Sequence, residues 1–319
     1  MKTRLTDLLG IDVPVMLAGM GGVSYSALVS AVSSAGGFGC LGASTMSSEE
    51  LVAEIAEVRA ATDRPFGVDL LTAFPDSLER NVELAIEGGA SVFVAGLGVP
   101  RHVIDTCHRH NVLVMSLCGK VEHARRALES GCDGVIAQGT EAGGHTGLVA
   151  TMPLVPLVVD AVGESIPVVA AGGIFDGRGL AAALALGADG VWIGTRFIAT
   201  PEARAVRGFK EHLLSGAEDD TTISRAYTGK TMRVLRNDRT KQYEADPSLL
   251  RPFPEQLMVS LADGSFHLGG DDTTVGVDER VEAYPAGQSV GGIGELVGAG
   301  ELVTRINAQA ESILTRLTR

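Results

Sequence analysis

The feature that most constrains the fold is a short apolar run that recurs along the first two-thirds of the chain. Each run is followed by a turn and then by a segment with the period of an amphipathic helix. The spacing of ~20 to 30 residues is typical of strand–helix units. The runs lie at 15–18, 38–41, 66–70, 92–95, 112–115, 135–138, 168–171 and 191–194. Apolar runs without alternation indicate parallel strands that are buried on both faces.

This alternation of strands and helices predicts a parallel α/β fold, and about eight units predict a closed (β/α)8 barrel. A doubly wound open sheet is the alternative. The clearest helix is expected from Ser48 to Val58, with Ser47 or Ser48 as its cap. A second is expected over 182–186, closed by Gly187.

The repeat stops after Phe197. Residues 201–285 contain polar, turn-like clusters, so we expect an insertion of short helices and loops. A final amphipathic run, 293–317, is expected to supply the eighth barrel helix. The barrel would then comprise 1–200 and 286–319. An insertion after the eighth strand emerges at the face where barrel active sites lie, so 201–285 is predicted to form a lid or substrate region.

Composition narrows the classes of function. The 319 residues carry a formal net charge of −13, which argues against a nucleic-acid partner because phosphate backbones bind clusters of Lys and Arg. No apolar run reaches the ~18 residues of a membrane span, and the N-terminus lacks the pattern of a signal peptide. The 4 Cys are scattered without metal-binding spacing, so we expect a cytoplasmic protein without a disulfide framework or a metal site.

Glycine-rich segments follow three of the predicted strands. Gly172-Gly173 follows the seventh and Gly194-Thr195 the eighth, where barrels bind phosphate through backbone N–H groups. Ala18-Gly19-Met20 ends the first strand, which adjoins the eighth in a closed barrel and could border a flat heteroaromatic ring. Ordinary tight turns are the alternative. The sequence favours the phosphate site, whereas the ring site and the turn are equally supported.

Two ionisable residues stand out. Asp69 lies within an apolar strand, where a carboxylate needs a partner, a ligand or a proton, and we favour a role facing a ligand. His145 lies on the glycine-rich loop 138–147 after the sixth strand. A histidine can move protons near neutral pH, and this one stands at the end of a barrel strand. His145 is therefore the candidate catalytic residue, with a structural role as the alternative.

These segments in this order resemble the nitronate monooxygenase family, formerly called 2-nitropropane dioxygenases, and the related enoyl-acyl-carrier-protein reductase II. The resemblance rests on segments 18–20, 65–69, 138–145, 170–174 and 194–197, and it returns weakly at 286–288. It implies a barrel that binds one FMN non-covalently. It places the phosphate at Gly172, Gly173, Gly194 and Thr195, the ring against Ala18, Gly19 and Met20, and Asp69, Gln138, Gly143 and Gly144 near the flavin.

In this family the residue matching His145 takes the α-proton of a nitroalkane or steers the nitronate. The resemblance therefore implies oxidation of nitronates with O2 to a carbonyl compound and nitrite. Family members commonly have Asn where this chain has Asp69. An ionised carboxylate could not donate a hydrogen bond there, so either the carboxyl is protonated or the contact differs.

Two other activities stay open beside nitronate oxidation. The run from Gly143 to Gly147 is closer to the thioester-reductase branch, which implies an NAD(P)H-dependent FMN reductase of an enoyl or other CoA or acyl-carrier thioester, or of a quinone. A non-catalytic flavin-binding protein is the third interpretation. Basic residues of the insertion could receive phosphates or form a solvated face: Arg225, Lys230, Arg233, Arg236, Arg239 and Lys241. We expect a small-molecule substrate and leave a homodimer open.

Overall fold

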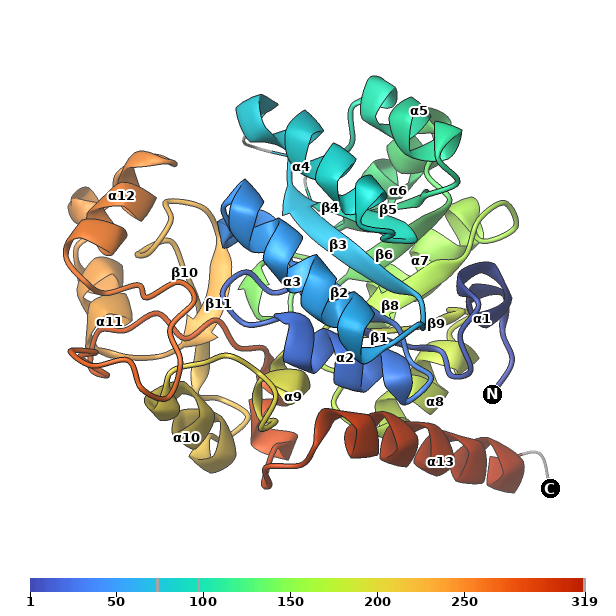
Figure 1. The fold of residues 1–319 in the computed structure, drawn as a ribbon. Coiled ribbons are helices and arrows are strands. Elements are labelled where there is room, and N and C mark those ends of the chain that lie inside the picture. Colours follow the sequence, from blue (N-terminus) through green and yellow to red (C-terminus); the bar gives the residue numbers. More distant parts are fainter. Residues whose placement is uncertain (73–74, 97, 318–319) are drawn as a thin grey trace.

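The barrel predicted from the sequence is present in the computed structural model, which describes residues 1–72, 75–96 and 98–317 (Figure 1). Its strands are β1 (Val15–Leu17), β2 (Gly39–Gly42), β3 (Phe66–Leu71), β4 (Val92–Gly96), β5 (Leu113–Cys118), β6 (Gly134–Gln138), β8 (Val168–Ala171) and β9 (Gly190–Ile193). They form one 8-stranded sheet in the order β1-β9-β8-β6-β5-β4-β3-β2. A parallel bridge between Met16 and Phe38 joins the first strand to the segment that leads into the second. The predicted fold class is thus confirmed.

The helices of the barrel cover the outside of the sheet (Figure 1). They are α1 (Arg4–Leu9), α2 (Ser26–Ser34), α3 (Ser48–Ala61), α4 (Pro75–Glu87), α5 (Arg101–Arg109), α6 (Val121–Ser130), α7 (Thr151–Val162), α8 (Gly177–Ala185), α9 (Thr195–Ile198) and α13 (Ala299–Leu317), with a short 3-10 turn η1 (Ala43–Thr45). Ser47 caps α3, because its hydroxyl accepts the N–H of Glu50 at 3.1 Å. Helix α13 begins at Ala299 rather than at 293 and packs against α8 and α2, in the position of the eighth barrel helix.

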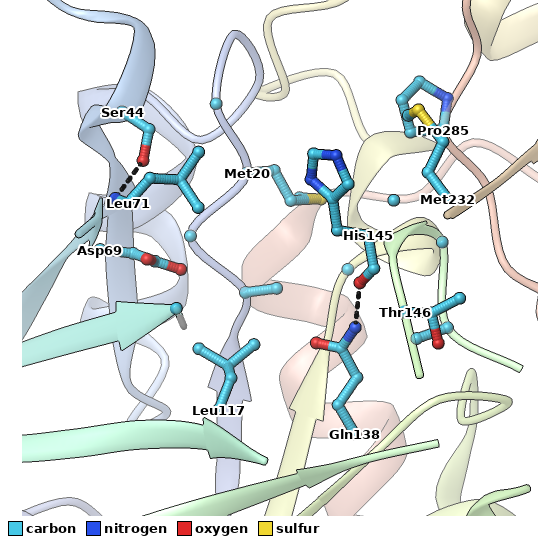
Figure 2. A pocket seen from close by; sticks show the side chains of 18 of the residues that line it. Met20, Ser44, Asp69, Leu71, Leu117, Gln138, His145, Thr146, Met232 and Pro285 are labelled. Atoms are coloured by element: carbon cyan, nitrogen blue, oxygen red, sulfur yellow. Dashed lines mark hydrogen bonds between the residues drawn. The ribbon is translucent and has the colours of Figure 1, made fainter. Parts of the chain in front are cut away.

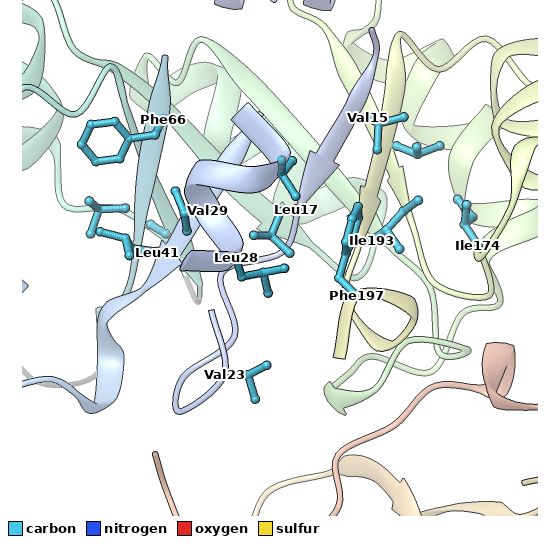
Figure 3. Packing of buried hydrophobic residues seen from close by; sticks show 14 of the residues in the cluster. Val15, Leu17, Val23, Leu28, Val29, Leu41, Phe66, Ile174, Ile193 and Phe197 are labelled. Atoms are coloured by element: carbon cyan, nitrogen blue, oxygen red, sulfur yellow. The ribbon is translucent and has the colours of Figure 1, made fainter. Parts of the chain in front are cut away.

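Side chains alternate between the two sides of the sheet, as the pleat of a strand requires. In β1, Val15 and Leu17 pack outward against the helices, whereas Met16 points into the barrel. Figure 3 shows the outer layer, in which Leu28 and Val29 of α2 face Leu17 and Leu41. Each such buried aliphatic side chain stabilises the fold by about 1.5–3 kcal/mol. The same alternation turns Asp69 inward at the carboxyl-terminal end of β3.

The insertion between α9 and the last helix contains strands as well as helices, so the expectation of helices and loops alone was wrong. Its elements are α10 (Arg207–Ser215), β10 (Thr221–Ser224), β11 (Met232–Leu235), α11 (Asp238–Ala245), η2 (Pro247–Leu249) and α12 (Glu255–Ala262), followed by η3 (Gln288–Gly292). The strand β7 (Gly144–His145) pairs with β11 and completes a 3-stranded antiparallel sheet. Strands of 4 residues carry too little periodicity to be recognised from sequence. The insertion therefore holds the loop that carries His145 by strand pairing between β11 and β7.

Within the described ranges, no helix is long and apolar enough to cross a membrane. The same residues contain no group of three or more His, Cys, Asp or Glu side chains arranged to hold a metal ion.

Candidate active site

A cavity of about 1380 Å³ lies at the carboxyl-terminal ends of the barrel strands, between the barrel and the insertion. All of the residues predicted to form the site line it: Ala18, Gly19, Met20, Asp69, Gln138, Gly143, Gly144, His145, Gly172, Gly173, Gly194 and Thr195. They lie in the carboxyl-terminal parts of β3 and β6, in β7, and in the segments that follow β1, β6, β8 and β9. Figure 2 shows Met20, Asp69, Gln138 and His145 around this space. The structure thus brings the whole predicted set together, although the role of each residue stays a prediction.

Backbone N–H groups gather where the phosphate site is predicted. Among the described residues, the N–H groups of Gly172, Gly173 and Gly194 make no hydrogen bond within the protein. Gly172 and Gly173 have positive φ angles of 103° and 74°, which L side chains rarely adopt. An added Cβ at Gly172 would lie 2.8 Å from the hydroxyl of Thr151. Unpaired N–H groups at an open cavity are the arrangement that binds an anion.

Thr195 is fixed at the same end of the cavity. Its hydroxyl oxygen accepts the N–H of Gly287 at 2.9 Å, so its own hydrogen is left to donate. The neighbouring Arg196 does not contribute charge to the cavity, because it is buried and donates to the carbonyl oxygen of Ala199 at 3.2 Å. The predicted anion site would therefore consist of backbone N–H groups and a hydroxyl, with the carboxylate of Glu141 beside Gly173.

Beside the predicted anion site, two loops approach their neighbours so closely that little room is left for a side chain. A Cβ at Gly19 would lie 2.2 Å from the Cβ of Asp69, and one at Gly194 would lie 3.2 Å from the sulfur of Met20. These glycines let the loops after β1, β3 and β9 approach one another across the top of the barrel. A planar ligand could therefore lie against backbone at this wall.

The carboxyl of Asp69 is buried at the inner wall. The residue is 9% exposed, and no hydrogen bond or ion pair satisfies its carboxyl within the described part of the chain. Desolvation raises the pKa of Asp69 to about 8. The carboxyl is then mostly protonated at pH 7 and can donate a hydrogen bond. Of the two explanations for an Asp at this position, the structure favours the protonated carboxyl.

We expect Asp69→Asn to stabilise the protein by roughly 2–4 kcal/mol near pH 7. Below pH ~4 the aspartate is protonated in both folded and unfolded chains. As the pH rises towards 8, the unfolded chain releases the proton and the folded chain keeps it, so the wild type loses stability over this window. Urea unfolding at pH 5 and pH 8 should show a smaller loss in Asp69→Asn. Asp105→Asn, at an exposed pair with Arg101, is the control, and equal losses in wild type and Asp69→Asn would contradict the assignment.

His145 is held by contacts on both sides of its strand. The side-chain amide of Gln138 donates to the carbonyl oxygen of His145 at 2.6 Å, as Figure 2 shows, and Met232 of β11 is its partner in the sheet. The ring Nε2 lies 3.0 Å from the hydroxyl of Thr228. Desolvation by the surrounding protein, and then the charge of Lys230, lower the pKa of His145. The exposed imidazole, oriented by Thr228, therefore opens onto the cavity.

The six basic residues of the insertion form neither one phosphate-binding surface nor one solvated face. Arg225 and Lys230 line the cavity. Arg239 is buried and pairs with Asp263 at 2.8 Å, and Arg233 is buried and donates to the carbonyl oxygen of Thr140 at 2.8 Å. Arg236 and Lys241 lie outside the cavity lining. Of these six residues, Arg225 and Lys230 are therefore the two placed to meet a ligand in the cavity.

Sequence reasoning missed several residues that face the cavity. Thr228 reaches His145 because β11 pairs with β7. His267, Glu282 and Tyr284 line the far wall and come from loops of the insertion, where no local pattern marks them.

The fold and the cavity define a (β/α)8-barrel enzyme with its site at the carboxyl-terminal face. The family model for nitronate monooxygenase matches residues 2–308. The chain therefore belongs to the nitronate monooxygenase family and is an oxidoreductase.

Three relatives show the range of this family. The chain is 44% identical to (3aS,4S,5R,7aS)-5-hydroxy-7a-methyl-1-oxo-octahydro-1H-indene-4-carboxyl-CoA dehydrogenase of Mycobacterium tuberculosis over 246 residues, 77% of this chain and 69% of the relative. The structure of FabK from Thermotoga maritima is similar with a TM-score of 0.89 and 33% identity, over 100% of this chain and 99% of that one. Nitroalkane oxidase from Streptomyces ansochromogenes gives a TM-score of 0.85 and 30% identity, over 98% and 99%.

Proposed function

We propose that this protein is an FMN-dependent oxidoreductase that acts on a CoA thioester. The size of the cavity carries this proposal. Pockets for one small ligand usually measure about 300–1,000 Å³, whereas this cavity is about 1380 Å³. It has room for a cofactor and an extended substrate together, and a small nitronate would leave much of it empty.

The predicted cofactor fits the residues at one end of the cavity. FMN carries one phosphate and a flat ring. The unpaired N–H groups of Gly172, Gly173 and Gly194 suit the phosphate, and the glycine wall beside Asp69 suits the ring. When bound, FMN supplies the electron acceptor or donor for the redox step. The protonated carboxyl of Asp69 can donate to a carbonyl group at the ring edge.

The other end of the cavity suits a thioester. Apolar side chains at and before α12, including Phe253, Leu257 and Leu261, line it together with the cations Arg225 and Lys230. Apolar side chains suit an acyl group, and cations suit the phosphates of CoA. The similarity to a CoA thioester dehydrogenase at 44% identity supports the same substrate class.

His145 is suited to move the proton that such a reaction requires. The tautomer with hydrogen on Nε2 donates to Thr228 and leaves Nδ1 as the atom that can take a proton. A proton α to a nitro group is acidic enough for a histidine base, and a proton α to a thioester carbonyl becomes so when hydrogen bonds to the carbonyl oxygen stabilise the enolate. The lowered pKa keeps the imidazole in its base form at neutral pH.

Nitronate oxidation is the second candidate, because the family and the nitroalkane oxidase neighbour support it. It requires the same flavin site and the same base. The two candidates differ in how much of the cavity their substrates fill. A CoA thioester would occupy the volume beyond the predicted flavin ring, and a small nitronate would leave it empty.

Anaerobic mixing separates the candidates. The purified yellow protein is mixed in turn with a saturated acyl-CoA, with ethyl nitronate and with NADH or NADPH, and the flavin absorbance is followed. We expect bleaching by the acyl-CoA. Bleaching by the nitronate alone supports the monooxygenase, bleaching by the nicotinamide alone supports a reductase, and bleaching by none contradicts both catalytic interpretations.

A further inference from the structure

A second histidine faces the cavity and is paired with a buried carboxylate. The ring Nδ1 of His267 lies 2.7 Å from Oε2 of Glu282, and the backbone N–H of His267 donates to Oε1 at 2.8 Å. Glu282 is 1% exposed, whereas the side chain of His267 is 27% exposed. Both residues line the cavity. The carboxylate is therefore hidden behind the imidazole, and the imidazole meets the ligand space.

The insertion holds Glu282 firmly in place. The carbonyl oxygen of Glu282 accepts a hydrogen bond from the side-chain amide of Asn237 at 2.8 Å. Asn237 also caps α11, so the anchor belongs to a regular element. The next residue, Ala283, packs in the small apolar core of the insertion. A carboxylate on such an anchor can fix the orientation of the ring that it binds.

The pair lies near both predicted reacting parts of the site. Ala283 shares its apolar core with Met232, which is the sheet partner of His145. On the other side, the loop after His267 touches the loop after β1, since a Cβ at Gly22 would lie 2.6 Å from the backbone nitrogen of Gly269. The His267–Glu282 pair thus lies between the part of the cavity wall that contains His145 and the part that contains Met20.

The hydrogen-bond pattern sets the chemistry of His267. A carboxylate can only accept, so the hydrogen lies on Nδ1 and the lone pair lies on Nε2. No group in the described ranges bonds to Nε2. When Nε2 takes a proton, the positive charge of the ring is offset by Glu282. His145 lacks such a partner, because its ring meets a hydroxyl and the cation Lys230.

We propose that His267, positioned by Glu282, is a second general base in this cavity and takes an acidic proton from an acyl-CoA substrate. The C–H bond α to the thioester carbonyl breaks, and its electron pair passes to the carbonyl oxygen. The proton forms an N–H bond at Nε2, and the imidazolium pairs with Glu282. The step needs no oxidant. This inference rests on the thioester substrate class proposed above.

Acetoacetyl-CoA tests the step without turnover, because its CH2 group lies between two carbonyls and its enolate absorbs ultraviolet light. The ligand is titrated into the holoenzyme at pH 7.5, and binding is followed separately by calorimetry. We expect a larger fraction of enolate in bound than in free ligand. His267→Gln and Glu282→Gln should each lower this fraction about tenfold while the ligand still binds. Glu282→Gln keeps the shape of the side chain and can still accept the N–H of His267.

The matched control is His102→Gln, at an exposed pair with Glu79 (2.9 Å) outside the cavity. It should leave the enolate fraction unchanged. An undiminished enolate fraction in His267→Gln, with normal binding, overturns the role of His267 alone. Failure of the wild type to bind acetoacetyl-CoA overturns the thioester proposal and this inference with it. Thermal unfolding of each variant shows that a lost signal does not come from a lost fold.

Discussion

His145→Ala is expected to lower the rate of anaerobic flavin reduction by about 10²–10⁴-fold while the protein keeps its flavin. The side chain lines the cavity at the loop after β6, whereas the predicted phosphate site lies on the loops after β8 and β9. Strand β7 pairs through backbone atoms, so it survives loss of the ring. The rate is measured by rapid mixing with whichever substrate bleaches the wild type.

The pH dependence makes this test more specific. The pKa of His145 is lowered, so its base form persists to below the ordinary value of ~6.5. Activity that depends on this base should fall only as the pH drops below that value, and the variant should lose this acid limb. His108→Ala, at an exposed pair with Asp133, is the control and should keep wild-type rates. A wild-type rate in His145→Ala would rule out catalysis by this ring.

Gly173→Asp is expected to yield protein without bound flavin. The φ angle of Gly173 is 74°, and an added Cβ would lie 3.1 Å from Oε2 of Glu141. A second carboxylate would thus occupy the predicted phosphate site and repel the phosphate. Flavin content is measured from the absorbance of the purified protein. Added FMN at 100 times its Kd should stabilise the wild type by about 2.7 kcal/mol and leave the variant unchanged.

Gly173→Ala separates charge from strain at this position. It adds a Cβ in the same strained backbone but brings no charge, so it should weaken FMN binding less than Gly173→Asp. A Gly173→Asp protein that is purified fully yellow would place the phosphate elsewhere. Loss of flavin to the same extent in both variants would assign the effect to backbone strain.

The eight barrel strands could be predicted because each is a continuous apolar run that needs only its own residues to be recognised. The segments Gly172-Gly173 and Gly194-Thr195 could be placed at one end of the barrel, since parallel strands end at the same face. The strands β10 and β11 could not be predicted. They are short and gain their stability by pairing with each other and with the loop of His145.

The protonation and pairing of the ionisable residues in the site depend on contacts between residues far apart in the sequence. No local sequence pattern indicates these contacts. The sequence left the protonation of Asp69 open, and burial beside Gly19 decides it. Glu282 and His267 stand 15 positions apart in irregular segments, and only the folded insertion turns one towards the other. Arg239 belonged to a basic cluster in sequence and became a buried partner of Asp263.

The sequence by itself determined the strand–helix units, the barrel, and the loops that meet at its carboxyl-terminal face. These follow from apolar periodicity and glycine placement, which act between near neighbours in the chain. Only the tertiary structure decided that His145 lies on an edge strand paired with the insertion, that Asp69 keeps its proton, and that Glu282 contacts the ring of His267. These features depend on desolvation and on charges that come together from distant segments of the chain. Both effects arise only when the chain has folded.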